Sequence, residues 1–329
     1  MSGRRNFIQK YMLGGAAALL AGGFARRAAA NGYPVGGVKI LVGNTPGSAA
    51  DLIARVVAKR LSDSWKQSVA IENRVGAGGV IAADAVAKSA GDGYTLLLGQ
   101  EGALAIAPAL QPNLSYDPQR DLLPVVALGE TDFVLVANPK TGMRSLADLI
   151  GEARKQPGKY TYASAGNGSL HHLAFELLKN RAGIDLVHIP FRGGPLGMND
   201  VIAGQVDVMF IGVAPALAQI QSGRLTALAL GGASRNPLLP QVPTVAETFP
   251  DFRATTWFAL FAPGGTPADV LERINREATQ AVREPELRAT LAAQGINALG
   301  GSALQLAELV REDTRKFAQL ARQVRLESN

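Results

Sequence analysis

Residues 38–53 read VKILVGNTPGSAADLI, and this stretch decides the fold class. Its β-branched opening predicts a strand over Val38–Gly43. A helix is expected over Ser48–Ser64, because apolar side chains recur at helical spacing from Leu52 to Leu61. Ser48, with Asp51 three residues later, is typical of a capping box at a helix N-terminus. The unit is therefore a strand, a short polar loop and a helix.

The same alternation continues along the chain in both directions. Further strands are expected over Val69–Glu72, Tyr94–Leu98, Phe133–Ala137, Lys159–Ala163, Leu186–Ile189, Val206–Ile211, Ala227–Leu230 and Thr256–Ala262. Further helices are expected over Val80–Lys88, Leu146–Lys155, Leu170–Arg181, Met198–Ala203 and Pro215–Ser222, and the last seventy residues are mainly helical. Strands that alternate with helices predict parallel sheets covered by helices on both faces.

These strands are too many for one comfortable sheet, and the pattern restarts near Phe133, so we predict two α/β lobes. A strand near Trp257 brings the chain back, which makes the first lobe discontinuous. The expected division is residues 31–132 plus 256–329 for lobe 1 and 133–255 for lobe 2. Two more capping boxes are expected, at Ser145 with Asp148 and at Thr266 with Asp269. In open α/β sheets, ligands bind at the carboxyl ends of strands, so the cleft between the lobes is the expected site.

Charge and cysteine content exclude several classes of function. The formal charge is +6, but five basic residues and no acid lie in the first 30 residues, so the body carries only about +1. A nearly neutral body has no phosphate-binding field, which argues against a nucleic-acid partner. The chain has no cysteine, which excludes disulfides, thiolate catalysis, cysteine–zinc sites and a lipoprotein anchor.

The first thirty residues have the three-part order of a cleavable export signal. Arg4 and Arg5 open a basic segment, a Gly- and Ala-rich stretch follows over 11–24, and small residues end at Ala30, the expected cleavage site. The alternative is a membrane anchor, but a membrane span needs about 20 apolar residues, which is more than the stretch 11–24 supplies. The paired arginines resemble a twin-arginine signal, and general secretion remains the other route. We therefore expect a periplasmic protein.

Two loops between a strand and a helix are the candidate ligand-binding segments. They cover residues 43–50 and 164–169, and both are rich in Gly and hydroxyl side chains and lack charged residues. Each opens onto a helix N-terminus, where free backbone N–H groups and a partial positive charge favour an anion. The alternative for either loop alone is an ordinary turn whose serine caps a helix. Because one loop falls in each lobe, a closing clamp would bring both helix ends onto one ligand.

Enzymatic sites are hard to assemble from this sequence. The glycines at 76–79 lack the third glycine of a dinucleotide fingerprint, since Ile81 stands there. His171 and His172 are adjacent, which is not the spacing of a helical metal pair, so no metal and no cofactor are expected. Ser169 stands fourth in its glycine motif rather than third, so it is no nucleophile elbow, and no catalytic residue is predicted. Arg192 could reach a carboxylate or be a solvated loop residue.

The ordered series of motifs resembles one family. They are Pro46-Gly47 with Asp51 and Ala54-Arg55, the stretches 72–79, 92–97 and 116–118, Pro157-Gly158-Lys159, Ser164 to Ser169 with His172-Leu173, and the stretches 188–193, 204–207, 239–244 and 262–267. The chain resembles the solute-binding proteins of the tripartite tricarboxylate transporter group, the Bug family, over residues 34–325. The resemblance implies a type II-like periplasmic binding protein with two crossover strands. It also implies a ligand carboxylate held between two helix N-termini by backbone amides, hydroxyls and ordered water.

The predicted ligand-binding residues combine the two loops with a third strand end. They are Thr45, Pro46, Gly47, Ser48, Ala49, Asp51, Ser164, Gly166, Asn167, Gly168, Ser169, His172, Phe210, Ile211 and Gly212. The chain departs from the family at residues 43–45, where an aromatic and two prolines are missing, so a more polar pocket is expected. An acidic or amide residue that is common in the family near Ile211 is also absent. Glu101 stands where an anion would be repelled or an amino group would be welcome.

The expected function is capture of a small carboxylate, possibly a di- or tricarboxylate, without conversion. The expected partners are that ligand and membrane transporter subunits, and the expected state is a monomer. Two alternatives are a sensor that presents its ligand to a membrane receptor, and an exported α/β hydrolase, which lacks a usable catalytic set.

Overall fold

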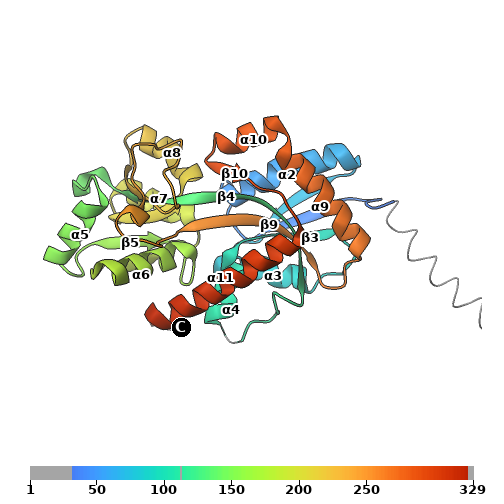
Figure 1. The fold of residues 1–329 in the computed structure, drawn as a ribbon, viewed down its shortest axis with the longest axis horizontal. Helices are drawn as coiled ribbons and strands as arrows, with labels where there is room; N and C mark the ends of the chain where they lie inside the picture. The colour runs from blue at the N-terminus through green and yellow to red at the C-terminus, as the bar shows by residue number, and fades with distance from the viewer. Residues whose placement is uncertain (1–31, 112, 325–329) are drawn as a thin grey trace, which may run out of the picture.

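The computed structural model describes residues 32–111 and 113–324, so the expected export signal at residues 1–30 lies outside them. Figure 1 shows two groups of strands and helices at the two ends of the long axis, joined by β4 and β9. The predicted fold, two α/β lobes with two crossover strands, is confirmed. The strands nevertheless form one hydrogen-bonded path, in the order β2-β1-β3-β9-β4-β7-β5-β6.

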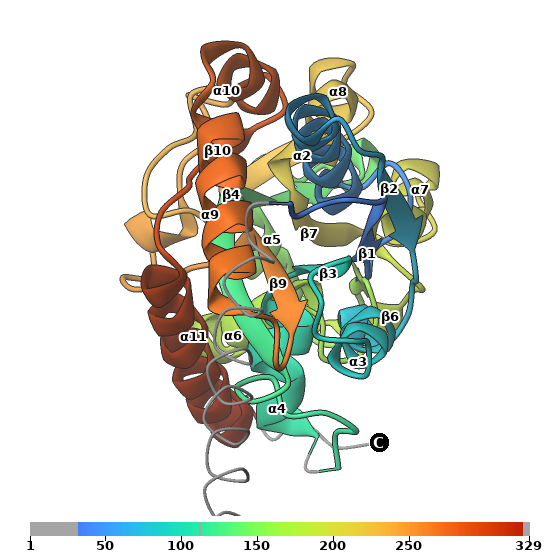
Figure 2. The ribbon, with the colours of Figure 1, turned by 90° about the vertical axis from the view of Figure 1, so that its right-hand side faces the viewer.

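The first lobe is built on three parallel strands. β1 (Val38–Val42) pairs with β2 (Val69–Asn73) on one side and β3 (Thr95–Gly99) on the other. The helices of this lobe are α2 (Ala49–Trp65), α3 (Val80–Ala87), α9 (Ala268–Arg283) and α10 (Pro285–Ala292), with the short turns η1 (Ala77–Gly79) and η2 (Gly102–Ile106) and α4 (Ala107–Leu110). Figure 2 shows α2 and α9 on one side of these strands and α3 on the other.

Helices on both faces explain why these strands are continuously apolar rather than alternating. Ile40 and Val42 pack in the core beneath α2 and α9, whereas Leu41 between them packs in the core beneath α3. The strands are therefore held in place by burial on both faces, and their carboxyl ends are left to carry the loops.

The second lobe repeats this plan. β5 (Thr161–Ser164) lies between β6 (Val187–Pro190) and β7 (Val208–Gly212), parallel to both. β8 (Thr226–Leu230) pairs antiparallel with β4. The helices are α5 (Leu146–Lys155), α6 (Leu170–Ala182), α7 (Gly194–Ala203) and α8 (Val213–Gln221), and a short turn, η4 (Val245–Glu247), precedes β9.

One long strand serves both lobes. β4 (Leu122–Ala137) pairs with β9 (Thr255–Pro263) from Leu122 to Asp132, and with β7 and β8 from Phe133 onward. The expected strand at Phe133 thus begins much earlier, at Leu122. Bulges near Pro124 and Gly129 interrupt the regular apolar pattern, which explains why the sequence did not predict a strand before Phe133.

The C-terminal segment ties the lobes together. β10 (Ile296–Ala298) pairs with β4, and α11 (Ala303–Val324) follows. Leu306 and Val310 of α11 pack in the core beneath α3, whereas Phe317 and Leu320 pack in the core of the second lobe. Figure 1 shows α11 crossing below β4 and β9. The last helix therefore buries its apolar face against both lobes.

Several helix starts differ from the sequence-based expectations. α7 begins at Gly194 rather than Met198, and α8 begins at Val213 rather than Pro215. Thr266 does not cap α9, because its hydroxyl donates to the Pro263 carbonyl and Pro267 is the N-cap. Complete capping boxes form at Thr244 with Glu247 and at Ser302 with Gln305, and neither was predicted.

Gly43, directly after β1, brings two loops into backbone contact. A Cβ on Gly43 would lie 2.5 Å from the Cα of Gly79. We expect Gly43→Ala to lower the free energy of unfolding by about 1–3 kcal/mol, because backbone atoms must shift to relieve this overlap. Gly151→Ala is the matched control, since nothing lies within 4 Å of its added Cβ inside α5.

Urea denaturation measures both glycine variants. Gly151→Ala should leave stability unchanged or raise it by up to about 1 kcal/mol, the difference in helix propensity. Equal stability of Gly43→Ala and the wild-type protein would show that the two loops are not in contact.

Candidate functional site

A cavity of about 730 Å³ lies between the lobes at the carboxyl ends of their strands. Four helices begin at its wall. The residues at these helix starts that line it are Ser48, Ala49 and Ala50 of α2, Ser169, Leu170 and His171 of α6, Gly193, Gly194 and Pro195 of α7, and Gly212 and Pro215 of α8. Each N-terminus carries a partial positive charge and free N–H groups. The cavity is therefore suited to an anion, and the sequence had indicated only two of these helix ends.

Apolar side chains form much of the remaining wall. They are Val75, Ile81, Phe133, Phe191, Ile211 and Phe258. Two charged side chains join them, Glu101 and Arg192, of which Glu101 is 4% exposed and Arg192 is exposed. No hydrogen bond or ion pair of Arg192 is found within residues 32–111 and 113–324. The space can thus hold a small organic molecule with a polar group at the helix ends and a carbon skeleton between them.

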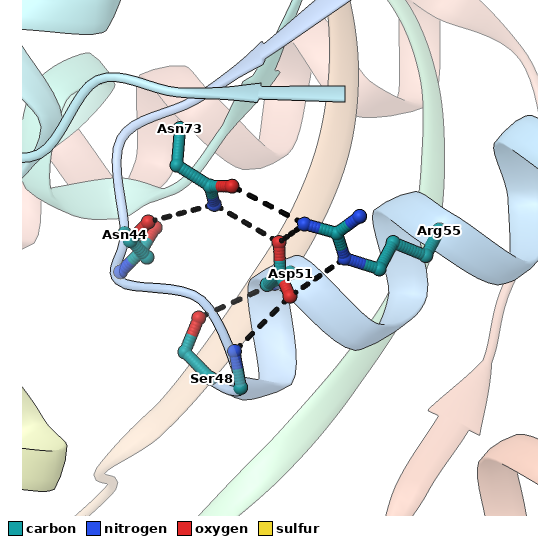
Figure 3. Close-up of polar contacts among 6 residues, drawn as sticks. Asn44, Ser48, Asp51, Arg55 and Asn73 are labelled. Atoms are coloured by element: carbon teal, nitrogen blue, oxygen red, sulfur yellow. Dashed lines mark hydrogen bonds and ion pairs between the residues drawn. The ribbon is translucent and has the colours of Figure 1, made fainter. Parts of the chain in front are cut away.

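The first loop is held by a buried carboxylate, Asp51 (Figure 3). Asp51 accepts hydrogen bonds from the Gly47 N–H at 3.0 Å, from Arg55 Nε and Nη2 at 2.9 Å each, and from Asn73 Nδ2 at 2.9 Å. Burial alone would raise the pKa of Asp51, but hydrogen bonds from Arg55, Asn73 and Gly47 outweigh it and lower the pKa below its usual value. Asp51 is therefore a charged anchor for the loop.

The expected capping box at this helix is only half formed. Ser48 Oγ accepts from the Asp51 N–H at 3.3 Å, but the Asp51 carboxylate binds the Gly47 N–H, and the Ser48 N–H donates to the Thr45 carbonyl. Asn73 Nδ2 also donates to the Asn44 carbonyl at 3.0 Å, which ties the loop to the end of β2.

The second loop is supported from behind by histidines. Ser164 Oγ accepts from the Gly166 N–H at 3.0 Å and lies 2.6 Å from His188 Nε2. His172 Nδ1 accepts from the Gly168 N–H at 3.2 Å, and its ring stacks on His188 with 4.1 Å between centroids. These contacts fix the backbone turn that precedes α6, away from the cavity surface.

The predicted site residues divide into two groups. Eight of them line the cavity: Thr45, Ser48, Ala49, Gly166, Asn167, Ser169, Ile211 and Gly212. Seven are not in its lining: Pro46, Gly47, Asp51, Ser164, Gly168, His172 and Phe210. Phe210 is fully buried and packs on Phe175 and Phe252, because alternate residues of β7 face opposite sides of the sheet.

His171 is the histidine of the cavity, in place of the predicted His172. Its ring packs on Phe133 with 4.7 Å between centroids, and burial lowers its pKa to about 4, so it is neutral at pH 7. Its Nδ1 is buried without a hydrogen-bond partner, as is Thr45 Oγ1 from the other lobe. Adjacent helix positions point in different directions, which is the signal that separates the two histidines.

The lobes contact each other at the rim of the cavity. A Cβ on Gly193 of the second lobe would lie 3.2 Å from Thr45 Cγ2 of the first. Gly193 also has φ of +124°, which disfavours other residues. Thr45, from the first lobe, therefore packs directly on the backbone at the start of α7.

The chain is similar to known proteins along most of its length. Residues 53–326 match the model of the tripartite tricarboxylate transporter family receptor. The chain is 37% identical over 303 residues to BugT of Bordetella pertussis, covering 92% of this chain and 93% of that protein. The chain belongs to the tripartite tricarboxylate transporter receptor family.

Three solved structures of similar proteins match this chain, and two of them are described with a bound acid. One from R. palustris with adipate is 30% identical, with a TM-score of 0.86, and the match covers 89% of this chain and 98% of that one. MatC from Rhodopseudomonas palustris with malate is 30% identical, with a TM-score of 0.82, covering 88% and 99%. The periplasmic binding protein BugD is 28% identical, with a TM-score of 0.85, covering 90% and 99%. Members of this family are thus periplasmic binding proteins.

Two kinds of feature are absent from the described residues. No group of three or more His, Asp or Glu side chains in residues 32–111 and 113–324 is arranged to hold a metal ion. In the same residues, no helix is long and apolar enough to cross a membrane.

The Asp51 anchor predicts a large loss of stability on substitution. Asp51→Ala leaves the Gly47 N–H, Asn73 and Arg55 without their shared acceptor, so we expect the free energy of unfolding to fall by about 2–3 kcal/mol. Asp63→Ala on the same helix removes an exposed pair with Lys59 and should cost less than about 1 kcal/mol. Chemical denaturation compares the two, and equal losses would contradict the anchor role of Asp51.

Proposed function

We propose that this receptor captures a small carboxylate in the cavity between its lobes and delivers it to a transporter. The observation that carries the proposal is the convergence of four helix N-termini on one cavity. Their partial charges and free N–H groups can neutralise a carboxylate without a dedicated cationic side chain. The acids bound by similar proteins, adipate and malate, support the same ligand class.

Capture without conversion is supported by the position of the one Ser–His contact described above. Ser164 Oγ lies 2.6 Å from His188 Nε2, a distance typical of a nucleophile and its base. Ser164 is fully buried, however, and is not part of the cavity wall. A substrate in the cavity would not reach its hydroxyl, so this pair supports the loop and argues against a hydrolase.

The cellular setting of the proposal combines family and sequence. Residues 1–30 serve as an export signal cleaved after Ala30, by the twin-arginine route or by general secretion. The mature chain acts in the periplasm as a monomer and docks on membrane transporter subunits. A sensor that presents the same ligand to a membrane receptor is the second candidate, because both roles need the same closed cavity.

The proposed moving parts are residues 31–132 plus 256–329 and residues 133–255. The change of pairing partners in β4 at Phe133 supports this boundary. The end of α11 packs on the second lobe through Phe317 and Leu320, so this helix must slide or bend when the lobes separate.

A thermal-shift screen of the mature protein tests the proposal. We expect a mono-, di- or tricarboxylate at 100 times its dissociation constant to add about 2.7 kcal/mol of stability. Neutral sugars and cationic amines serve as controls and should not shift the melting curve. Stabilisation by a neutral or cationic solute and by no acid would refute carboxylate capture, and turnover of the tightest ligand would refute a pure receptor.

Arg192 predicts a preference for ligands with a second acid group. This exposed guanidinium lines the cavity, so Arg192→Gln should weaken binding of a dicarboxylate about two- to fivefold, and less at high salt. Arg224→Gln is the control, since Arg224 is exposed on the same lobe but does not line the cavity. Isothermal titration measures both, and equal effects would remove Arg192 from the site.

A further inference from the structure

Glu101 is a carboxyl group in the wall of a cavity built for an anion. It stands two residues after the end of β3 and is 4% exposed. Gln100 and Thr256 line the cavity beside it. A negative charge in this position would oppose the four helix N-termini, so the protonation state of Glu101 decides what the cavity accepts.

The hydrogen bonds around Thr256 indicate a protonated carboxyl group. Thr256 Oγ1 lies 2.9 Å from Glu101 Oε1 and 2.8 Å from Oε2, and it accepts from Gln100 Nε2 at 3.1 Å. A hydroxyl has one proton and two acceptor sites. Thr256 can therefore donate fully to only one oxygen of Glu101. If the other oxygen carries a proton and donates back to Thr256, both short contacts become full hydrogen bonds.

The charged groups around Glu101 act on its proton in opposite directions. From α11, Asp313 repels a negative charge on Glu101, and Lys316 attracts it. Asp313 accepts from Trp257 Nε1 at 2.7 Å, which holds it near β9, and Arg253 interacts with Lys316 from the segment before β9. On the cavity side stand the neutral His171 and, at an exposed position, Arg192.

The charge of the cavity wall depends on this proton, because Glu101 and Arg192 are the charged side chains in its lining. With Glu101 neutral, the helix N-termini and the exposed Arg192 favour an anionic ligand. With Glu101 ionised, the ligand faces a buried carboxylate that repels it. Burial raises the pKa of Glu101 to about 8, which agrees with the hydrogen-bond geometry.

We propose that Glu101 is a specificity-determining residue that makes the site accept its anion only while the Glu101 carboxyl group holds a proton. This inference rests on the proposed capture of a carboxylate. A ligand with an ammonium group in contact with Glu101 is disfavoured, because a protonated carboxyl group offers no charge to it. Capture is thereby linked to pH through one side chain.

The direction of the linkage follows from the two protonation states. Anion binding favours the protonated form, so the affinity is constant below the pKa of Glu101 and falls as the pH rises through it. One linked proton gives a tenfold change for each pH unit well above the midpoint. With a midpoint near pH 8, the dissociation constant should be up to about 30-fold higher at pH 9.5 than at pH 7.

The first measurement needs no ligand. Carbon-13 NMR of the mature protein, labelled at its glutamate residues, should show a carboxyl group that titrates near pH 8. The signal is assigned by its loss in Glu101→Gln. Asp313→Asn should move this midpoint to lower pH, because it removes the repelling charge. Glu247→Gln is the control and should not move it, because Glu247 does not line the cavity and pairs with Arg235. A midpoint below pH 6 would overturn the proposal.

The second measurement is isothermal titration with malate and adipate from pH 6 to pH 9.5. The wild-type affinity should fall above pH 8, and that of Glu101→Gln should not change with pH. Binding with the same pH profile in both proteins overturns the role of Glu101 but leaves carboxylate capture intact. Failure of both acids to bind at every pH counts instead against the proposed capture. Tighter binding of aspartate above pH 8 also overturns the proposal, since an ionised Glu101 would then pair with its ammonium group.

Discussion

The antiparallel pairing of β4 with β9 is the constraint on which the two-lobed structure depends. A single strand, β4, pairs with β9 up to Asp132 and with β7 and β8 from Phe133 onward. Both sheets are thereby anchored to one backbone. Because the parallel strands of each lobe end toward this junction, their loops meet across one space. The position of the cavity is thus a consequence of strand pairing rather than of any single side chain.

Within that frame, the site is made mainly of backbone. Glycines let the loops after β1, β2 and β3 approach closely, and the same small residues expose N–H groups at the helix starts. The charged side chain nearest the first helix end, Asp51, is already engaged by the Gly47 N–H and by Arg55. An anion can therefore be held by dipoles in an apolar cavity, where such interactions are stronger than in water.

Local patterns were enough to predict the lobes and the loops. The strand–loop–helix unit at residues 38–53 is apolar and capped in ways that depend only on neighbouring residues, and the structure has it. The extension of β4 back to Leu122 could not be read, because Pro124 and Gly129 interrupt a segment that is fixed by pairing with a distant strand. The sequence predicted His172 at the cavity, but His171 lines it, and this difference also depends on contacts distant in the sequence. Which helix face meets the cavity is set by tertiary packing, here by Phe133 on one side and His188 on the other.

Glu101 and the polar residues around it lie on, or next to, the elements that connect the two lobes. Glu101 begins the turn after β3, Thr256 lies on the returning strand β9, and Asp313 and Lys316 lie on α11, which packs on both lobes. The charge of Glu101 acts on α11 through its electrostatic interactions with Asp313 and Lys316, and on β9 through its hydrogen bond with Thr256. The charge of Glu101 therefore acts on α11 and β9, which connect the two lobes, as well as on the cavity. A residue here can affect affinity through closure as well as through contact, which distinguishes Glu101 from Arg192 at its exposed position on the cavity wall.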